Sequence, residues 1–243
     1  MNLVIDIGNS SSKIALYSDN QIIEDDRFFI KPQLNWFQKM FEAYKPDHSI
    51  VCSTKVLTQD VLEYLNSQHS LVLTHETPLP IVLDYKSIDT LGRDRIAASV
   101  GAKKRFPNDD CLVIDLGTCI TYDFITRQDI YKGGAISPGL KMRFKAMNEY
   151  TDNLPIVEKP KFIHEFGKDT RESLSMGGMN GIVHEINGFI RLFNSNSKRL
   201  KVILTGGDIS LFEQHLEIAI FAAPNLVLDG LNEVLLYNKQ LNE

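Results

Sequence analysis

The apolar and polar residues of the chain follow strand and helix periods in an order that occurs twice. The first half is predicted to contain strands at Asn2–Gly8, Lys13–Ser18 and Gln21–Phe29, a helix around Trp36, Phe37, Met40 and Phe41, a strand at Ser49–Ser53, a helix at Gln59–Ser67 and a strand at Leu71–Leu73. The second half is predicted to contain strands at Cys111–Asp115, Ile120–Thr126 and Ile130–Ile136, helices from about Leu140 and from about Arg171 to Phe193, a strand at Lys201–Thr205, a short helix at Leu211–Leu216, a strand near Ala219–Phe221 and a terminal helix at Gly230–Asn238. The order predicts an α/β protein with a duplicated β-β-β-α-β-α plan and mixed sheets.

The length of 243 residues suits two lobes of ordinary domain size. The segment Pro107-Asn108-Asp109-Asp110 is polar and breaks helices, and it separates the two periodic regions. We therefore expect a first lobe at residues 1–109 and a second lobe at residues 110–243.

Two short segments resemble each other, IDIGNSSSKIALY at 5–17 and IDLGTCITYDFI at 114–125. Each has an apolar strand, then Asp, one apolar residue and Gly, then Asn-Ser or Thr, and a second strand. We expect Gly8 and Gly117 to adopt backbone angles closed to other residues, so that main-chain N–H groups approach an anionic oxygen. A single such tip is also an ordinary hairpin turn, whereas two matched copies favour a nucleotide clamp.

The side chains at the two tips fit a phosphate site. Hydroxyl donors come from Ser10, Ser11, Ser12 and Thr118. Lys13 adds a positive charge. Asp6 and Asp115 would repel phosphate, so each carboxylate predicts a cation between itself and the phosphate.

Composition and charge exclude several classes of protein. The net charge of −5 argues against nucleic-acid binding, which needs a concentrated basic face. The sequence shows neither a secretory signal nor an apolar run long enough for a membrane span, so we expect a cytoplasmic protein. The three cysteines, Cys52, Cys111 and Cys119, have no metal-ligand spacing and are expected to be reduced thiols.

Four further motifs each have a structural and a functional interpretation. In Gly92-Arg93-Asp94-Arg95, Asp94 either stabilises a helix start or accepts a proton from a substrate hydroxyl. In the second case a neighbouring arginine would bind the anionic group of the substrate through two hydrogen bonds. GGAISPG at 133–139 either presents N–H groups to an anion or only turns the chain. LTGGD at 204–208 either admits an adenine or ribose or forms a tight loop. Asp169 and Glu172 predict a capping box, in which Thr170 is the first helical residue; alternatively, the Thr170 hydroxyl projects into a pocket at the helix N-terminus.

Taken together and in this order, DIGNSSSK, GRDR, DLGT, GGAISPG, KDTRESLSMGG and LTGGD closely resemble the type III pantothenate kinases over essentially the whole chain. The resemblance implies the two-lobe ATPase fold of actin, hexokinase and Hsp70. It also implies ATP-dependent phosphorylation of the 4′-hydroxyl of pantothenate, the first step of coenzyme A synthesis. A homodimer with the substrate pocket at its interface, and activation by K⁺ or NH₄⁺, are further implications.

The resemblance also assigns residues. The ATP phosphates would be surrounded by Asp6, Ile7, Gly8, Asn9, Ser10, Ser11, Ser12, Lys13 and Thr118, with Asp6 near the Mg²⁺ that accompanies ATP. The proton acceptor would be Asp94, and the pantothenate site would consist of Tyr85, Gly92, Arg93, Asp94, Arg95 and Thr170. Asp115 would bind the monovalent cation. The sequence departs from the family at Ser10, usually Thr, and at Cys119, usually Ala; the usual Asn-Pro between Tyr85 and Gly92 is absent.

Two other classes of function share part of this pattern. Another small-molecule or sugar kinase of the superfamily would have both hairpins, and its substrate would distinguish it. A non-catalytic regulator or an assembling ATPase would not need an intact GxDR motif. Asp94 and Arg95 are both present, and this favours a catalyst.

Overall fold

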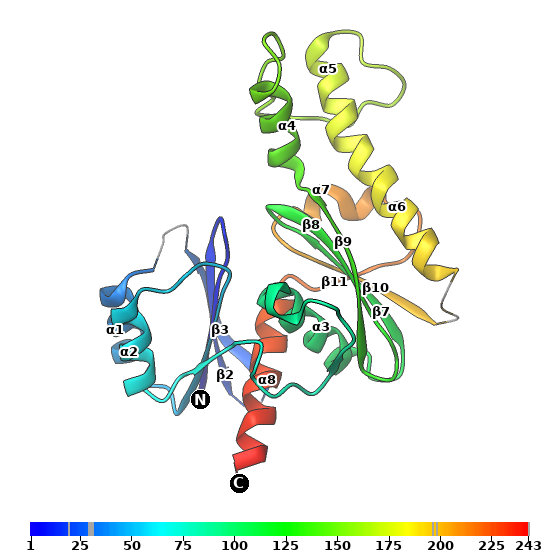
Figure 1. Ribbon diagram of the computed structural model, residues 1–243. Helices are drawn as coiled ribbons and strands as arrows, with labels where there is room; N and C mark the ends of the chain where they lie inside the picture. Colours follow the sequence, from blue (N-terminus) through cyan, green and yellow to red (C-terminus); the bar gives the residue numbers. More distant parts are fainter. Residues whose placement is uncertain (19, 29–31, 196, 198, 243) are drawn as a thin grey trace. The chain divides into compact units, whose positions relative to one another are not determined.

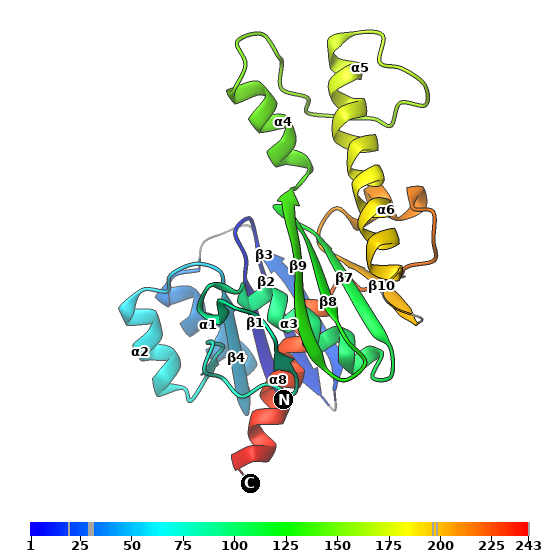
Figure 2. The ribbon, with the colours of Figure 1, turned by 45° about the vertical axis from the view of Figure 1, so that its right-hand side comes forward.

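The computed structural model describes residues 1–18, 20–28, 32–195, 197 and 199–242 (Figures 1 and 2). Its contacts group the residues into two units. The first comprises Met1–Asn108, Ile125–Lys132 and Asn225–Glu243, and the second comprises Asp109–Phe124 and Gly133–Pro224. Among the described residues, no helix has the length and the apolar character needed to cross a lipid bilayer.

The two main sheets have the same strand order. In the first unit the order is β3-β2-β1-β4-β5, with β1 at Asn2–Ile7, β2 at Ser12–Ser18, β3 at Gln21–Phe28, β4 at His48–Ser53 and β5 at Leu71–Val72. The second sheet has the order β11-β10-β7-β8-β9-β6, with β6 at Val82–Leu83, β7 at Asp110–Leu116, β8 at Cys119–Ile125, β9 at Ile130–Pro138, β10 at Leu200–Thr205 and β11 at Phe221–Ala222. Read from its other edge and without β6, the second sheet has the order β9-β8-β7-β10-β11, which corresponds strand by strand to β3-β2-β1-β4-β5. The predicted duplication is therefore confirmed at the level of topology.

Helices of four turns or fewer connect the strands, and one longer helix ends the chain. The α-helices are α1 at Leu34–Tyr44, α2 at Gln59–Ser67, α3 at Arg93–Arg105, α4 at Leu140–Glu149, α5 at Thr170–Ser175, α6 at Gly181–Asn194, α7 at Ile209–Phe212 and α8 at Leu226–Asn242. Short 3-10 turns occupy Ile88–Thr90 and Glu213–His215. A π-helical turn at Met176–Asn180 joins α5 to α6, so the three segments form one rod (Figure 1).

The central strand β1 is covered on both faces, but only one of the faces is wholly apolar. Leu3, Ile5 and Ile7 belong to a core cluster with Phe37 of α1 and Leu65 of α2. The opposite face meets α8, where the Asn2 amide donates to Asn232 at 2.9 Å and the Tyr17 hydroxyl donates to Asp229 at 2.9 Å. Since side chains alternate along a strand, Asp6 lies on the same face as Asn2.

Helices α3 and α8 pack at very short range. A Cβ on Gly230 would lie 1.8 Å from the carbonyl oxygen of Ala97, and a Cβ on Gly101 would lie 2.4 Å from that of Leu226. Only glycine at these two positions permits the approach, so α8 supports the helix that begins with Arg93 and Asp94.

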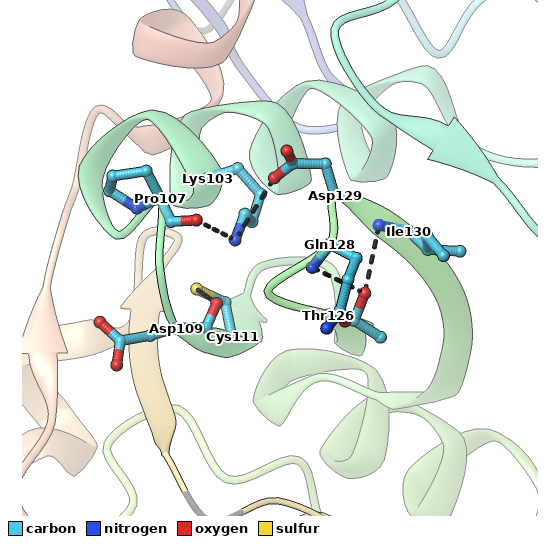
Figure 3. Close-up of polar contacts among 8 residues, drawn as sticks. All are labelled: Lys103, Pro107, Asp109, Cys111, Thr126, Gln128, Asp129 and Ile130. Carbon is cyan, nitrogen blue, oxygen red and sulfur yellow. Dashed lines mark hydrogen bonds and ion pairs between the residues drawn. The ribbon is translucent and has the colours of Figure 1, made fainter.

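A buried lysine joins the end of α3 to the turn that precedes β9, both in the first unit. Lys103 is 5% exposed; its Nζ donates to the Pro107 carbonyl at 2.9 Å and pairs with Asp129 at 3.4 Å (Figure 3). Asp129 lies in the turn between β8 and β9, where Thr126 Oγ1 accepts from the backbone N–H groups of Gln128 and Ile130, both at 3.3 Å. The ion pair therefore holds this turn on α3.

The structure modifies several predicted boundaries. The first unit ends at Asn108, next to the predicted break, but Ile125–Lys132 and the terminal helix also pack with it. The predicted lobes, 1–109 and 110–243, are continuous and follow the repeated order of elements, whereas each unit defined by contacts combines separate segments of the chain. The two lobes remain a prediction. The terminal helix begins at Leu226, four residues before the predicted start, and β6 was not predicted. Phe29, the predicted end of the third strand, lies outside the described residues.

Candidate active site

The first hairpin, Asp6–Lys13, joins β1 to β2 in the register that pairs Asp6 with Lys13 and Ile7 with Ser12. The Gly8 N–H donates to the Ser11 carbonyl at 3.0 Å and closes the tip. Asn9 and Ser10 are exposed there, and Ser12 is buried. The tip therefore presents short polar side chains directly above a buried strand.

The expectation about the backbone angles of Gly8 and Gly117 is wrong. The described glycines with positive φ are Gly133, at 89°, and Gly206, at 98°. An added Cβ would be tight at both hairpin glycines, since it would lie 3.0 Å from the Ser11 carbonyl oxygen at Gly8 and 3.0 Å from Asp115 Oδ1 at Gly117.

The start of α3 lies beside the first hairpin. Strand β4 pairs with β1 in parallel and sets Cys52 next to Asp6, and the Cys52 thiol hydrogen-bonds to the Asp6 carboxylate. Arg93 donates from Nη1 to the Ser53 carbonyl at 3.2 Å. Burial, followed by the charges of Asp6 and Asp94, raises the pKa of the Cys52 thiol well above its usual value. Both carboxylates are thus close enough to influence the same thiol.

Asp94 stabilises the start of α3, as one of its two interpretations predicts, and its role as a proton acceptor remains a prediction. Its Oδ1 accepts from the Arg95 backbone N–H at 2.9 Å, as a carboxylate in the first turn of a helix should. A Cβ on Gly92 would lie 2.5 Å from that oxygen, so glycine makes room for the carboxylate. The Arg95 side chain is buried beneath this turn.

Ser12 Oγ and Arg93 Nε are buried near these elements and have no hydrogen-bond partner within the described part of the chain. Ser12 is 1% exposed. Burying a polar atom without a hydrogen bond costs free energy, so we expect a ligand or a water molecule to hydrogen-bond to these two atoms.

The second hairpin tip, Asp115–Cys119, lies between β7 and β8 in the second unit. The Gly117 N–H donates to the Cys119 carbonyl at 3.2 Å. The backbone of Leu116 is covered by Gly206 of the LTGGD turn, where a Cβ would lie 2.5 Å from Leu116 C. The Asp208 N–H donates to the Leu116 carbonyl at 3.1 Å. Gly206 therefore has a packing role, and Thr118 is exposed at the tip.

The N-cap half of the predicted capping box is confirmed at the start of α5, whereas Glu172 reaches back one residue beyond the N-cap. Asp169 Oδ1 accepts from the Glu172 N–H at 2.8 Å, and Glu172 Oε2 accepts from the Lys168 N–H at 2.8 Å. Thr170 is the first residue of α5 and is exposed. The next two residues, Arg171 and Glu172, line a cavity of about 670 Å³.

A family model described as type III pantothenate kinase matches residues 2–192. The chain belongs to the type III pantothenate kinase family. Family members from Phocaeicola vulgatus and Cytophaga hutchinsonii, both named type III pantothenate kinase, are 40% and 41% identical to it. The alignments cover 99% and 98% of this chain and 100% of each relative.

Solved structures show the fold. The structure of a conserved putative Baf family transcriptional activator from Campylobacter jejuni has a TM-score of 0.59 and is 22% identical in sequence. The alignment covers 98% of this chain and 99% of the other. A putative N-acetylmannosamine kinase from Listeria monocytogenes has a TM-score of 0.59 at 12% identity, with the same coverage. The predicted α/β ATPase fold of the actin and hexokinase type is confirmed.

A kinase of this family uses ATP with a divalent metal, and the first hairpin fits such a metal. The described residues contain no group of three or more His, Cys, Asp or Glu side chains able to hold an ion. Mg²⁺ suits this arrangement, because it is usually held by one or two carboxylates together with substrate phosphates and water. Asp6 is the carboxylate of the first hairpin.

The predicted site residues fall in both units. Asp6–Lys13, Tyr85 and Gly92–Arg95 belong to the first unit, whereas Asp115, Thr118 and Thr170 belong to the second. The Tyr85 ring lies 5.9 Å from the Tyr131 ring, centroid to centroid. Sequence reasoning missed Cys52 beside Asp6; the parallel pairing of β1 with β4 is the signal that places it there.

Proposed function

We propose that this protein transfers the γ-phosphoryl group of ATP to the 4′-hydroxyl of pantothenate, the first step of coenzyme A synthesis. The observation that carries the proposal is 40% identity over the full chain to proteins named for this reaction. The position of the GxDR turn next to the first hairpin supports it, since the two motifs must act on one phosphoryl group.

Phosphoryl transfer depends mainly on positioning and on neutralising charge, because its transition state is loose. We assign the ATP phosphates to the first hairpin, Asp6–Lys13, and to Thr118 of the second. Lys13 and the tip N–H groups would stabilise charge on the phosphate oxygens, and the buried Ser12 hydroxyl would donate to one of them. Mg²⁺ bound with ATP, near Asp6, would neutralise further charge.

We assign Asp94 as the group that orients the pantothenate hydroxyl and accepts its proton late in the transfer. A carboxylate held by one backbone N–H still has lone pairs free to accept a hydroxyl. Pantothenate itself would contact Gly92, Arg93, Arg95 and Tyr85 in the first unit and Thr170 in the second. The buried guanidinium Nε of Arg93 is a donor for an anionic or carbonyl oxygen.

A monovalent cation, K⁺ or NH₄⁺, is assigned to Asp115. A carboxylate at a phosphate-binding tip needs a cation to offset its repulsion. We expect replacement of K⁺ by Na⁺ to lower the rate severalfold, and Asp115→Asn to remove this difference between the cations. Initial rates in buffers matched for ionic strength test this, with Asp152→Asn, a change in an exposed loop, as the control. Equal rates in K⁺ and Na⁺ would rule the cation site out.

A homodimer is the proposed assembly. The second unit exposes large apolar side chains at the end of β9, along α4 and in the segment before α5, and we assign these side chains to the interface between the two subunits. They are Ile136, Met142, Tyr150, Ile156 and Phe166. Sedimentation equilibrium should give twice the chain mass. The cytoplasmic location expected from the sequence remains a prediction.

The reaction is tested by coupled ADP release from ATP with pantothenate or hexoses as the acceptor. The proposal predicts release that depends on pantothenate and on K⁺, with 4′-phosphopantothenate as the product. Release with a hexose alone would identify another kinase of the superfamily. Filaments that sediment only with nucleotide, without phosphoryl transfer, would identify an assembling ATPase.

A further inference from the structure

A partly buried carboxylate in the second unit collects donors from three elements. Glu185 of α6 accepts from the Tyr122 hydroxyl of β8 at 2.8 Å, from Ser137 Oγ of β9 at 2.5 Å and from Arg143 Nη2 of α4 at 2.5 Å. The side chains of Glu185 and Arg143 are 24% and 19% exposed. Burial acts to raise the pKa of Glu185, but the three donors outweigh it and hold the pKa below its usual value. The carboxylate is therefore ionised at neutral pH.

Arg143 passes this restraint to the corner where β9 turns into α4. Its Nε donates to the Pro138 carbonyl at 2.9 Å, and its backbone N–H donates to the Gly139 carbonyl at 3.0 Å. Ser137, the residue before Pro138, is held directly by Glu185. Ser137 and Pro138 are thus held by the side chains of the ion pair, and Gly139 is held by the first main-chain hydrogen bond of α4.

The same corner lies directly against the second hairpin tip. The Gly139 N–H donates to the Thr118 carbonyl at 3.2 Å. A Cβ on Gly139 would lie 2.4 Å from the Gly117 carbonyl oxygen and 2.5 Å from that of Thr118. Because these are backbone atoms with no side chain between them, a displacement of the corner must displace the tip. The GGAISPG motif, which the sequence could explain as a simple turn, therefore packs against the second hairpin tip through its last residue, Gly139.

We propose that Glu185 is a positioning residue that, through Arg143 and Ser137, holds the second hairpin tip in the geometry that binds the ATP phosphates. The proposal rests on the proposed function, because it takes Thr118 to be a phosphate ligand. Glu185 itself contacts the three donors described above and reaches the tip only through the corner.

The test compares Glu185→Gln with Glu217→Gln. Glutamine keeps an acceptor for Tyr122 and Ser137 but removes the charge paired with Arg143. Glu217 pairs with Arg191 at 3.1 Å in the same unit, but these two side chains are 64% and 65% exposed. Amide hydrogen exchange is measured on both variants and the wild type. Binding of a nonhydrolysable ATP analogue with Mg²⁺ is measured by calorimetry on the same samples.

In Glu185→Gln, we expect exchange at Gly139 and at Gly117–Cys119 to become about tenfold faster, and analogue affinity to fall about tenfold, as loss of one charge-assisted hydrogen bond predicts. Exchange elsewhere in the second unit and the Glu217→Gln control should match the wild type. Should Glu185→Gln fail to fold, Ser137→Ala removes one donor and should give the same local pattern at smaller amplitude.

Unchanged exchange at Gly139 and the tip would overturn the proposal. Uniformly faster exchange across the unit would also overturn it, because a merely structural residue would give that result. So would local loosening with wild-type affinity for the analogue. A wild type that binds the analogue but leaves pantothenate unphosphorylated would refute the proposed function alone.

Discussion

Replacement of Asp94 by Asn is expected to lower kcat by about 10²-fold or more while fold and ATP affinity are preserved, which is the usual scale for loss of a general base. The fold should survive because the Asn side-chain oxygen can accept from the Arg95 N–H as Asp94 Oδ1 does at 2.9 Å. ATP affinity should survive because the assigned phosphate contacts lie on the hairpins. The loss should appear in single-turnover rates as well as in kcat.

The matched control is Asp89→Asn. Asp89 lies in the 3-10 turn just before Gly92, is exposed, and has no assigned role. The same chemical change there should leave turnover at the wild-type level. If Asp94→Asn turned over pantothenate at a near-normal rate, Asp94 would not be the base, and its only role would be to stabilise the first turn of α3.

Replacement of Gly230 by Ala is expected to destabilise the protein by about 1–3 kcal/mol, the usual range for overpacking. Helix propensity alone predicts the opposite, a gain of roughly 1 kcal/mol. Packing should prevail because a Cβ on Gly230 would lie 1.8 Å from the Ala97 carbonyl oxygen and 2.8 Å from the Gly101 N, both backbone atoms. Turnover should fall as well, since α3 must shift and Asp94 lies in its first turn.

The matched control is Gly188→Ala in α6, where an added Cβ would have no neighbour within 4 Å. There the propensity gain should appear undiminished. Urea unfolding of the two variants and the wild type measures both free energies, with an unchanged m-value as the condition for comparing them. Equal stabilisation at both positions would contradict the close packing of α3 and α8.

Local patterns in the sequence predicted those features of the structure that are formed by residues close together in the chain. The two hairpins could be placed because each consists of adjacent strands, and the capping box could be placed because its residues lie three apart. The position of the terminal helix could not be predicted in this way. Its contacts with β1 and β2 join residues more than 200 positions apart, such as Tyr17 and Asp229.

The network around Glu185 was invisible for the same reason. Its partners Tyr122, Ser137 and Arg143 lie 63, 48 and 42 residues away and come from three different elements. Cys52 is an intermediate case, since a buried strand that pairs in parallel with β1 can be expected, but the register that sets Cys52 beside Asp6 appears only in the fold. Function in this chain thus depends on a scaffold whose long-range contacts the motifs do not encode.

The most direct test of the account is a crystal structure of the protein with Mg²⁺ and a nonhydrolysable ATP analogue. We predict one triphosphate in contact with both the first hairpin, Asp6–Lys13, and the second tip, Asp115–Cys119. A nucleotide held by only one of the two, with the other facing solvent, would contradict the account.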